Sequence, residues 1–214
     1  MFKRVIQHMK DVERAMDGMG ANAAFAFALA CTERQWPVFQ RAAERVPWMV
    51  DWQGKLRHDL DAAWQHMLNG TLLQFDDSLA RFRELLLSWV AGPMETEEAD
   101  GFSSALVQTI ANSIVNILDG IQKANVSSAS FSANRNLDLL DLLLDEHGVR
   151  LEDLGEKSGD DPAEITAVRE LIEQEMQQQD RDVQALRKDS SAAGIEEVRR
   201  ASVGKYLFGQ VWFS

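Results

Sequence analysis

The chain has 214 residues, 45% of them hydrophobic, and a formal net charge of −12 at pH 7. This length and apolar content fit one domain that buries a sizeable core without a metal or disulfide staple. The acidic balance and the lack of a basic stripe argue against nucleic-acid binding, because such binding requires Lys and Arg to neutralise phosphates.

The composition also argues against export and membrane insertion. Cys31 is the single cysteine, which rules out an intramolecular disulfide and fits a reducing compartment. The N-terminal segment contains Asp11, Glu13 and Asp17, and these acids interrupt the apolar core that an export signal needs. The run 105–118 is too short and too polar to span a bilayer. We therefore expect a soluble, cytoplasmic protein with no membrane contact.

Helical periodicity begins at the N-terminus. Apolar residues at spacings of three and four predict a helix over residues 2–17. Gly18 and Gly20 follow directly, and glycines in this position are typical of a helix end.

The most informative segment is AAFAFALACTERQWPVF at residues 23–39. It is apolar on all sides, which predicts a helix buried in the core. Pro37 predicts a bend or a stop in the last turn of this segment, because proline lacks the amide and clashes with the preceding turn. Beyond the bend we expect the helix to continue to about Arg45.

Two amphipathic helices are predicted next. Residues 49–67 repeat apolar side chains every three or four positions until Gly70, which fits a helix end. Residues 75–89 show the cleanest helical spacing of the chain. Residues 91–100 combine glycine, proline and several acids, and they predict a linker.

A fifth helix follows, with branched apolar residues along one face over residues 107–121. The segment 125–136 is rich in serine, alanine and asparagine, and it fits either a small-residue helix or a turn. Leucines over 137–144 return to a helical period, and Gly148 predicts its end.

The acidic last third predicts two more helices. A polar connection over 149–160 leads to residues 161–164, Asp-Pro-Ala-Glu, which combine an N-cap, a proline at the first helical position and an acid. A long helix starts there and carries one apolar stripe as far as Leu186. A shorter helix is predicted over 195–206.

These elements predict an all-α, single-domain antiparallel helical bundle of about eight helices over residues 1–206. Residues 207–214 form an apolar and aromatic tail that docks either on the body or on a neighbour. No internal repeat of constant period is present.

Charge is distributed unevenly along the chain. Residues 138–214 hold 18 acidic and 9 basic residues, a net charge of −9, against −3 for residues 1–137. An acidic surface complements a basic protein and speeds its encounter by electrostatic steering. The candidate partner-binding residues are acids of this part and two aromatic residues of the tail: Asp138, Asp141, Asp145, Glu146, Glu152, Asp153, Glu170, Glu173, Trp212 and Phe213.

The sequence offers one weak metal-site pattern, formed by His58, Asp61 and His66 on the third predicted helix. Its neighbours Arg57 and Asp59 indicate the solvent side of an amphipathic helix, so we assign no metal site. We also assign no catalytic residue and no cofactor.

Three further polar features of the sequence are open to a structural or a functional interpretation. Cys31 lies in an apolar run, which predicts a buried thiol acting as a small hydrophobe. Glu33 and Arg34 form either a partly buried salt bridge or a recognition site. A polar line on the fifth helix fits a ligand site, an interhelical hydrogen-bond ladder or plain surface: Gln108, Asn112 and Asn116.

Several of these motifs occur in an order that resembles one known family. The motifs are AC-x-ER-x-WP-x-F at residues 30–39, FDDSLARF at 75–82, and Arg181-Asp182 in an acidic long helix. They resemble the YjaG-like family of uncharacterised bacterial proteins over about residues 20–200. The resemblance implies a cytoplasmic, wholly helical fold without established activity, so no catalytic residue is carried over.

We therefore hypothesise a non-enzymatic acidic protein-binding module, in one version an immunity or antitoxin-like inhibitor of a basic bacterial toxin. The alternative is a small-ligand or metal-binding helical protein, or an enzyme of unknown reaction, with a pocket that uses Glu33, His58 or Asn112. A third hypothesis is a homo-oligomer that associates through residues 211–213.

Overall fold

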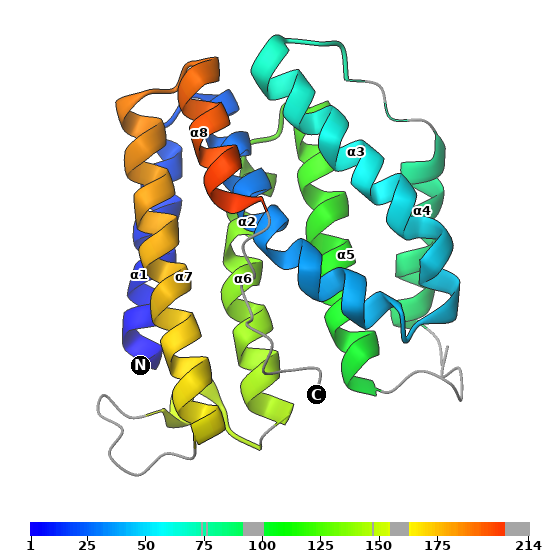
Figure 1. Cartoon of the computed structure of the whole chain (residues 1–214), viewed down its shortest axis with the longest axis vertical. Helices are drawn as coiled ribbons and strands as arrows, with labels where there is room; N and C mark the ends of the chain where they lie inside the picture. Colours follow the sequence, from blue (N-terminus) through cyan, green and yellow to red (C-terminus); the bar gives the residue numbers. More distant parts are fainter. Residues whose placement is uncertain (74, 76, 92–100, 147, 155–162, 204–214) are drawn as a thin grey trace.

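The computed structural model describes residues 1–73, 75, 77–91, 101–146, 148–154 and 163–203. Within these residues the chain forms eight α-helices and two short 3-10 helices, and no strand, which confirms the predicted all-α bundle (Figure 1). The elements are α1 (Phe2–Asp17), α2 (Ala21–Ala43), η1 (Pro47–Met49), α3 (Val50–Asn69), α4 (Asp77–Ala91), α5 (Gly101–Gln122), α6 (Ser127–Glu146), η2 (Leu151–Asp153), α7 (Ala163–Lys188) and α8 (Ala192–Ser202).

Helix α2 runs through the middle of the molecule. It contacts α3, α5, α6, α7 and α8, and every residue from Ala23 to Trp36 is buried. Its alternating alanines and larger apolar residues allow neighbouring helices to approach on all sides. The prediction of a buried second helix is therefore confirmed.

Pro37 does not end α2. The helix continues through the proline to Ala43, two residues short of the predicted end at Arg45. Val38, Phe39 and Ala42 are buried beyond the proline. Packing of this last part against the core compensates for the amide hydrogen bond that proline removes.

Helices α5 and α6 form an antiparallel pair that packs against α2. The ambiguous small-residue segment contributes a tight turn and then the start of α6 at Ser127. At this turn the amide of Asn125 donates to the carbonyl of Gly120 at 2.8 Å. The two helices approach so closely here that a Cβ on Gly120 would lie 2.5 Å from Cβ of Ser128. Small residues in this segment therefore permit the close crossing.

Helix α5 is longer than its sequence pattern predicted. By length and composition alone, Gly101–Gln122 could cross a membrane, and it is the one described helix that meets this criterion. In the fold, 56% of its most apolar stretch is buried, against α2, α3, α4 and α6. Burial on several sides is typical of a core helix.

Other boundaries differ by a few residues from the predictions. Helix α4 starts at Asp77, two residues after the start of the predicted pattern, and α8 spans Ala192–Ser202, where the sequence predicted 195–206. The 3-10 helix η2 lies in the segment predicted as a polar connection. Residues 92–100 of the predicted linker and the tail 207–214 lie outside the described residues.

The chain directions bring three helix ends together. Helices α1 and α7 start at the end of the bundle where α6 finishes (Figure 1). Helix α7 packs against α1, α2, α6 and α8. This arrangement places α7 along the length of α1, from the Arg4–Glu173 pair to the contact of Arg187 with the carbonyl of Ala15, and places the middle of α7 against α2.

Two glycine substitutions test the close crossing of α5 and α6. Gly120→Ala should lower the free energy of unfolding by about 1–3 kcal/mol, because its Cβ would overpack against Ser128. Gly54→Ala is the matched control within α3, where a Cβ meets no atom within 4 Å. This control should raise stability by about 0.5–1 kcal/mol through helix propensity. Urea unfolding measures both changes, and a neutral or stabilising Gly120→Ala would contradict the crossing.

Candidate functional site

The polar centre of α2 carries a fully buried arginine. The side chain of Arg34 is 3% exposed, and its carboxylate partners Glu175 and Asp182, both on α7, are 1% and 2% exposed. Nε and Nη2 of Arg34 each donate at 2.9 Å to the carboxylate of Glu175. Nη1 donates to Asp182 at 2.8 Å and to Oγ of Ser202 at 3.1 Å, and Nη2 reaches Sγ of Cys31 at 3.3 Å. All five N–H donors of the guanidinium therefore have an acceptor.

Amide side chains complete the coordination of the two carboxylates. Asn136 on α6 and Gln179 on α7 donate to Oε1 of Glu175 at 2.6 and 2.9 Å. Gln178 donates to Asp182 at 2.8 Å. Asn136 in turn accepts a hydrogen bond from Gln35 on α2. We call Arg34, its partners Cys31, Glu175, Asp182 and Ser202, and these amide residues the buried network, which links α2, α6, α7 and α8.

Burial raises the pKa of two groups in the buried network. It raises the pKa of the Asp182 carboxyl above its ordinary value of 3.8, against the opposing effect of the Arg34 guanidinium. Burial likewise raises the pKa of the Cys31 thiol well above its usual range. The thiol is therefore kept protonated, and the prediction that Cys31 is buried is confirmed.

Glu33 and Arg34 are both buried, but they pair with different partners. The carboxylate of Glu33 accepts from Arg57 at 2.6 and 2.9 Å and from Nε1 of Trp64 at 2.8 Å. Arg57 also donates to Asp61 at 2.7 Å. The two adjacent charges of α2 therefore connect the helix to different neighbours, Glu33 to α3 and Arg34 to α7.

The buried network extends towards the surface through a histidine of α1. Nε2 of His8 lies 2.9 Å from Oε1 of Gln179, the same residue that donates to Glu175. Nδ1 of His8 lies 3.6 Å from the carboxylate of Asp180, and the His8 side chain is 9% exposed. A chain of polar contacts thus runs from Arg34 to a surface groove between α1 and α7.

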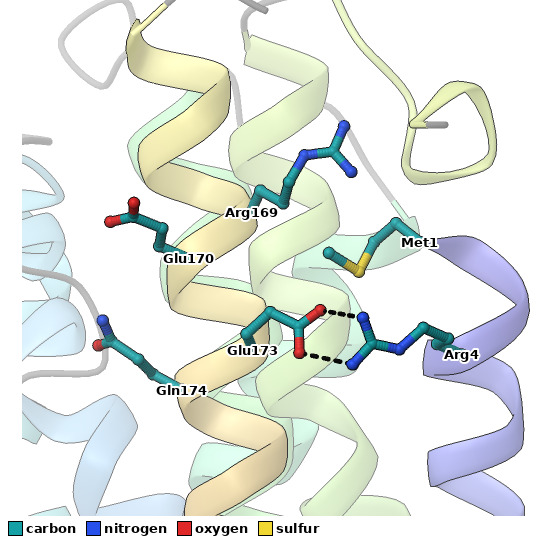
Figure 2. Close-up of a pocket in the computed structure, with 6 residues that line it drawn as sticks. All are labelled: Met1, Arg4, Arg169, Glu170, Glu173 and Gln174. Carbon is teal, nitrogen blue, oxygen red and sulfur yellow. Dashed lines mark hydrogen bonds and ion pairs between the residues drawn. The ribbon is translucent and has the colours of Figure 1, made fainter. Parts of the chain in front are cut away.

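This α1–α7 groove contains two hollows that share Arg4 and Glu173. One has a volume of about 320 Å³, and the residues that line it are Met1, Arg4, Arg169, Glu170, Glu173 and Gln174 (Figure 2). The other measures about 330 Å³ and is lined by Arg4, Gln7, His8, Asp11, Glu173, Met176, Gln177 and Asp180. These volumes suit a small ligand or a few side chains of a partner.

A bidentate salt bridge crosses the groove where the hollows meet. Nη1 and Nη2 of Arg4 donate to the two carboxylate oxygens of Glu173 at 2.6 and 2.7 Å, as Figure 2 shows. Arg4 is 63% exposed and Glu173 is 27% exposed. Solvent screening makes such a pair a weak contribution to stability, so the groove is held mainly by the core beneath it.

The predicted partner-binding acids divide into two groups. Asp138 pairs with Arg135 at 2.7 Å, and Asp141 accepts the amide of Leu151 at 3.1 Å, so both serve local structure. Burial raises the pKa of each of these two carboxyls. The remaining described acids lie on the surface or in the groove: Asp145, Glu146, Glu152, Glu170 and Glu173.

Three of the predicted site residues have no described side chain. Trp212 and Phe213 lie outside the described residues. Asp153 belongs to η2, but its side chain is also outside the described part. Their role in binding stays a prediction.

The weak metal pattern on α3 does not converge on one point. Asp61 pairs with Arg57, His66 is hydrogen-bonded to the carbonyl of Thr71 at 2.6 Å, and His58 is exposed. Among the described residues, no group of three or more His, Cys, Asp and Glu side chains is placed to hold a metal ion. Asp59 is buried at 8% exposure, so the expectation that it lies on the solvent side is wrong.

Sequence reasoning missed the partners of Arg34. Glu175 and Asp182 are seven residues apart on α7, on the face that also carries the buried Ile172 and Met176. Two acids within an apolar stripe are a signal, because an unpaired charge on a buried face is too costly to retain. Their partner could not be identified, since Arg34 lies 141 positions before Glu175.

Removal of the guanidinium tests the buried network. Arg34→Met should lower the free energy of unfolding by about 3–5 kcal/mol, because it leaves two buried carboxylates without their cation. Arg14→Met is the matched control on α1, where Arg14 is 72% exposed and pairs with Asp11. This control should change stability by less than about 0.5 kcal/mol in the same denaturant titration. Equal effects of the two substitutions would rule out a special role for Arg34.

The pH dependence of stability tests the burial of Asp182. Its raised pKa means that the folded state binds the proton more tightly than the unfolded state. The stability of the wild type relative to Asp182→Asn should therefore be greatest below about pH 3.8, fall as pH rises through the raised pKa, and then level off. Denaturant titrations across this range measure the difference. A difference that rises with pH would show that attraction to Arg34 outweighs burial.

Comparison with known proteins identifies the fold and gives no function. No family model matches the chain, and no curated protein matches it. A solved structure of a DUF416 family protein from Shewanella baltica OS155 is similar, with a TM-score of 0.60 and 15% sequence identity over 88% of this chain and 91% of that chain. This chain therefore shares the fold of a protein from an uncharacterised family.

Proposed function

We propose that the chain is a non-enzymatic acidic protein-binding module that binds a basic protein through the end of the bundle where α1 starts. In the more specific version it is an immunity or antitoxin-like inhibitor of a basic toxin. We also propose that it is a member of the YjaG-like family, which the motif around Cys31 and the fold shared with an uncharacterised protein support.

Exposed carboxylates at this end of the bundle are the observation that carries the proposal. Asp145 and Glu146 end α6, Glu152 lies on η2, and Glu170 lies on the first half of α7. All four are exposed. The ion pair between Glu152 and Arg150 is long, with an N–O distance of 3.5 Å. Because Glu152 already has Arg150 as a neighbour, we give the name acidic end to the other three acids, Asp145, Glu146 and Glu170.

Electrostatics explains how the acidic end would act. A surface of one charge sign raises the association rate of an oppositely charged partner, and this effect weakens as salt screens it. A net charge of −9 over residues 138–214 supplies the field, although Glu175 and Asp182 lie inside the core. The acids outside the core are the ones available for steering.

The α1–α7 groove supports a second candidate function, the binding of a small ligand. Its two hollows of about 320 and 330 Å³ have the size of small-molecule sites and carry polar groups of both charge signs. This candidate replaces the predicted pocket around Glu33, His58 and Asn112. In the structure the carboxylate of Glu33 is already bound by Arg57 and Trp64.

Charge neutralisation at the acidic end tests the protein-binding proposal. The full chain is used to capture proteins from an extract of its native host, and the captured protein is identified and its affinity measured by calorimetry. The triple variant Asp145→Asn, Glu146→Gln, Glu170→Gln should bind this protein at least about tenfold more weakly. Most of the loss should come from a slower association rate, and the loss should be largest at low salt, where charges are least screened.

The control removes three exposed charges elsewhere, with the substitutions Glu13→Gln, Glu44→Gln and Glu84→Gln. It has the same net charge as the test variant and should keep most of the affinity. Equal losses in both variants would mean that net charge alone matters. Failure to capture any protein, at low and at moderate salt, would count against the proposal.

A further inference from the structure

The two ring nitrogens of His8 lie near different groups, and these groups determine which nitrogen donates a hydrogen bond. Nε2 lies 2.9 Å from Oε1 of Gln179, whose Nε2 donates to the carboxylate of Glu175. Because that carboxylate accepts only, Gln179 has to direct its amide nitrogen towards Glu175 and its oxygen towards His8. The His8 ring must then donate from Nε2. The buried network thereby selects the tautomer of a residue in the α1–α7 groove.

This tautomer leaves the other ring nitrogen as an acceptor. In the neutral ring, Nδ1 presents a lone pair towards Oδ1 of Asp180, which is 3.6 Å away. Two acceptors do not bond to each other, and the separation exceeds hydrogen-bond range. A donor placed about 2.9 Å from each atom satisfies both acceptors at once.

The surroundings favour a cationic donor. His8 and Asp180 line the hollow of about 330 Å³. Two further acids of this hollow already pair with arginines, Asp11 with Arg14 and Glu173 with Arg4, so Asp180 is the lining acid that an incoming cation would meet. The charge of Arg4 on the same hollow is offset by its salt bridge to Glu173. The side chain of His8 is 9% exposed, whereas that of Asp180 is 60% exposed, so the site opens to solvent on the Asp180 side.

We propose that His8 and Asp180 bind a primary ammonium group, supplied by a lysine side chain of the basic partner. This inference rests on the proposed function and names the chemistry of one contact within it. A single tetrahedral nitrogen with three donors fits two acceptors 3.6 Å apart, whereas the planar guanidinium of arginine matches the fork of one carboxylate.

Nitrogen NMR of the histidine rings tests the site directly. The full chain, labelled with ¹⁵N, is titrated at pH 8 with the peptide acetyl-Gly-Lys-Gly-amide at millimolar concentration. The Nδ1 resonance of His8 should shift on binding, while Nε2 stays protonated. His58, exposed on α3, serves as the internal control and should not shift.

Matched ligands and variants define the chemistry. The peptide with Nε-acetyl-lysine should produce no shift, and the peptide with arginine should bind more weakly. Asp180→Asn should weaken lysine-peptide binding by about fivefold or more, because it removes the charged acceptor. Asp17→Asn, an exposed acid of α1, should leave binding unchanged.

Several outcomes would overturn the inference. They are an unchanged His8 resonance, equal shifts with acetylated lysine, or wild-type binding by Asp180→Asn. Tighter binding of spermidine than of the lysine peptide would assign the site to a free polyamine and overturn the lysine source.

The failure of this inference and that of the proposed function are distinguishable. If a captured partner binds Asp180→Asn as tightly as the wild type but loses affinity for the acidic-end variant, the ammonium site falls and the proposed function stands. If the lysine peptide binds at His8 but no partner is captured, the site stands and the proposed function falls.

Discussion

The fold depends on one buried cation, Arg34, at the centre of α2. A guanidinium at 3% exposure is stable only where its donors are satisfied and its charge is balanced. Here α7 supplies both carboxylates, and α8 supplies a hydroxyl through Ser202. Such a network fixes register: a shift of α7 by one residue would remove both acids from the guanidinium. The apolar surfaces of the helices provide the driving force, and Arg34 restricts how they pack.

The same network connects the interior to the α1–α7 groove. Gln179 touches Glu175 on one side and His8 on the other, so one amide orients groups in the core and at the surface. A groove built in this way is pre-organised, because its inner wall cannot rotate without breaking buried hydrogen bonds. The acidic end and the groove share one residue, because Glu170 of α7 also lines the hollow of about 320 Å³.

The sequence predicts most of the helices, because a spacing of three and four between apolar residues places them on one face of a helix and on both faces of a strand. The uncertain places are those where tertiary contacts outweigh local preference. Pro37 lies within a continuous helix because Val38 and Phe39 are buried beyond it, and the segment after Gly120 is ambiguous because its serines serve a helix crossing. The candidate site was less predictable: the groove joins residues more than 160 positions apart, and only Glu170 and Glu173 were identified as site residues beforehand.

The thiol of Cys31 has a further consequence for experiments. Its sulfur lies under the guanidinium of Arg34 and has no solvent exposure. A thiol-specific reagent can modify it only after the packing around this part of α2 opens, so the modification rate measures how often the centre of the bundle opens. Since the chain has no other cysteine, this signal comes from one known position and requires no engineered probe.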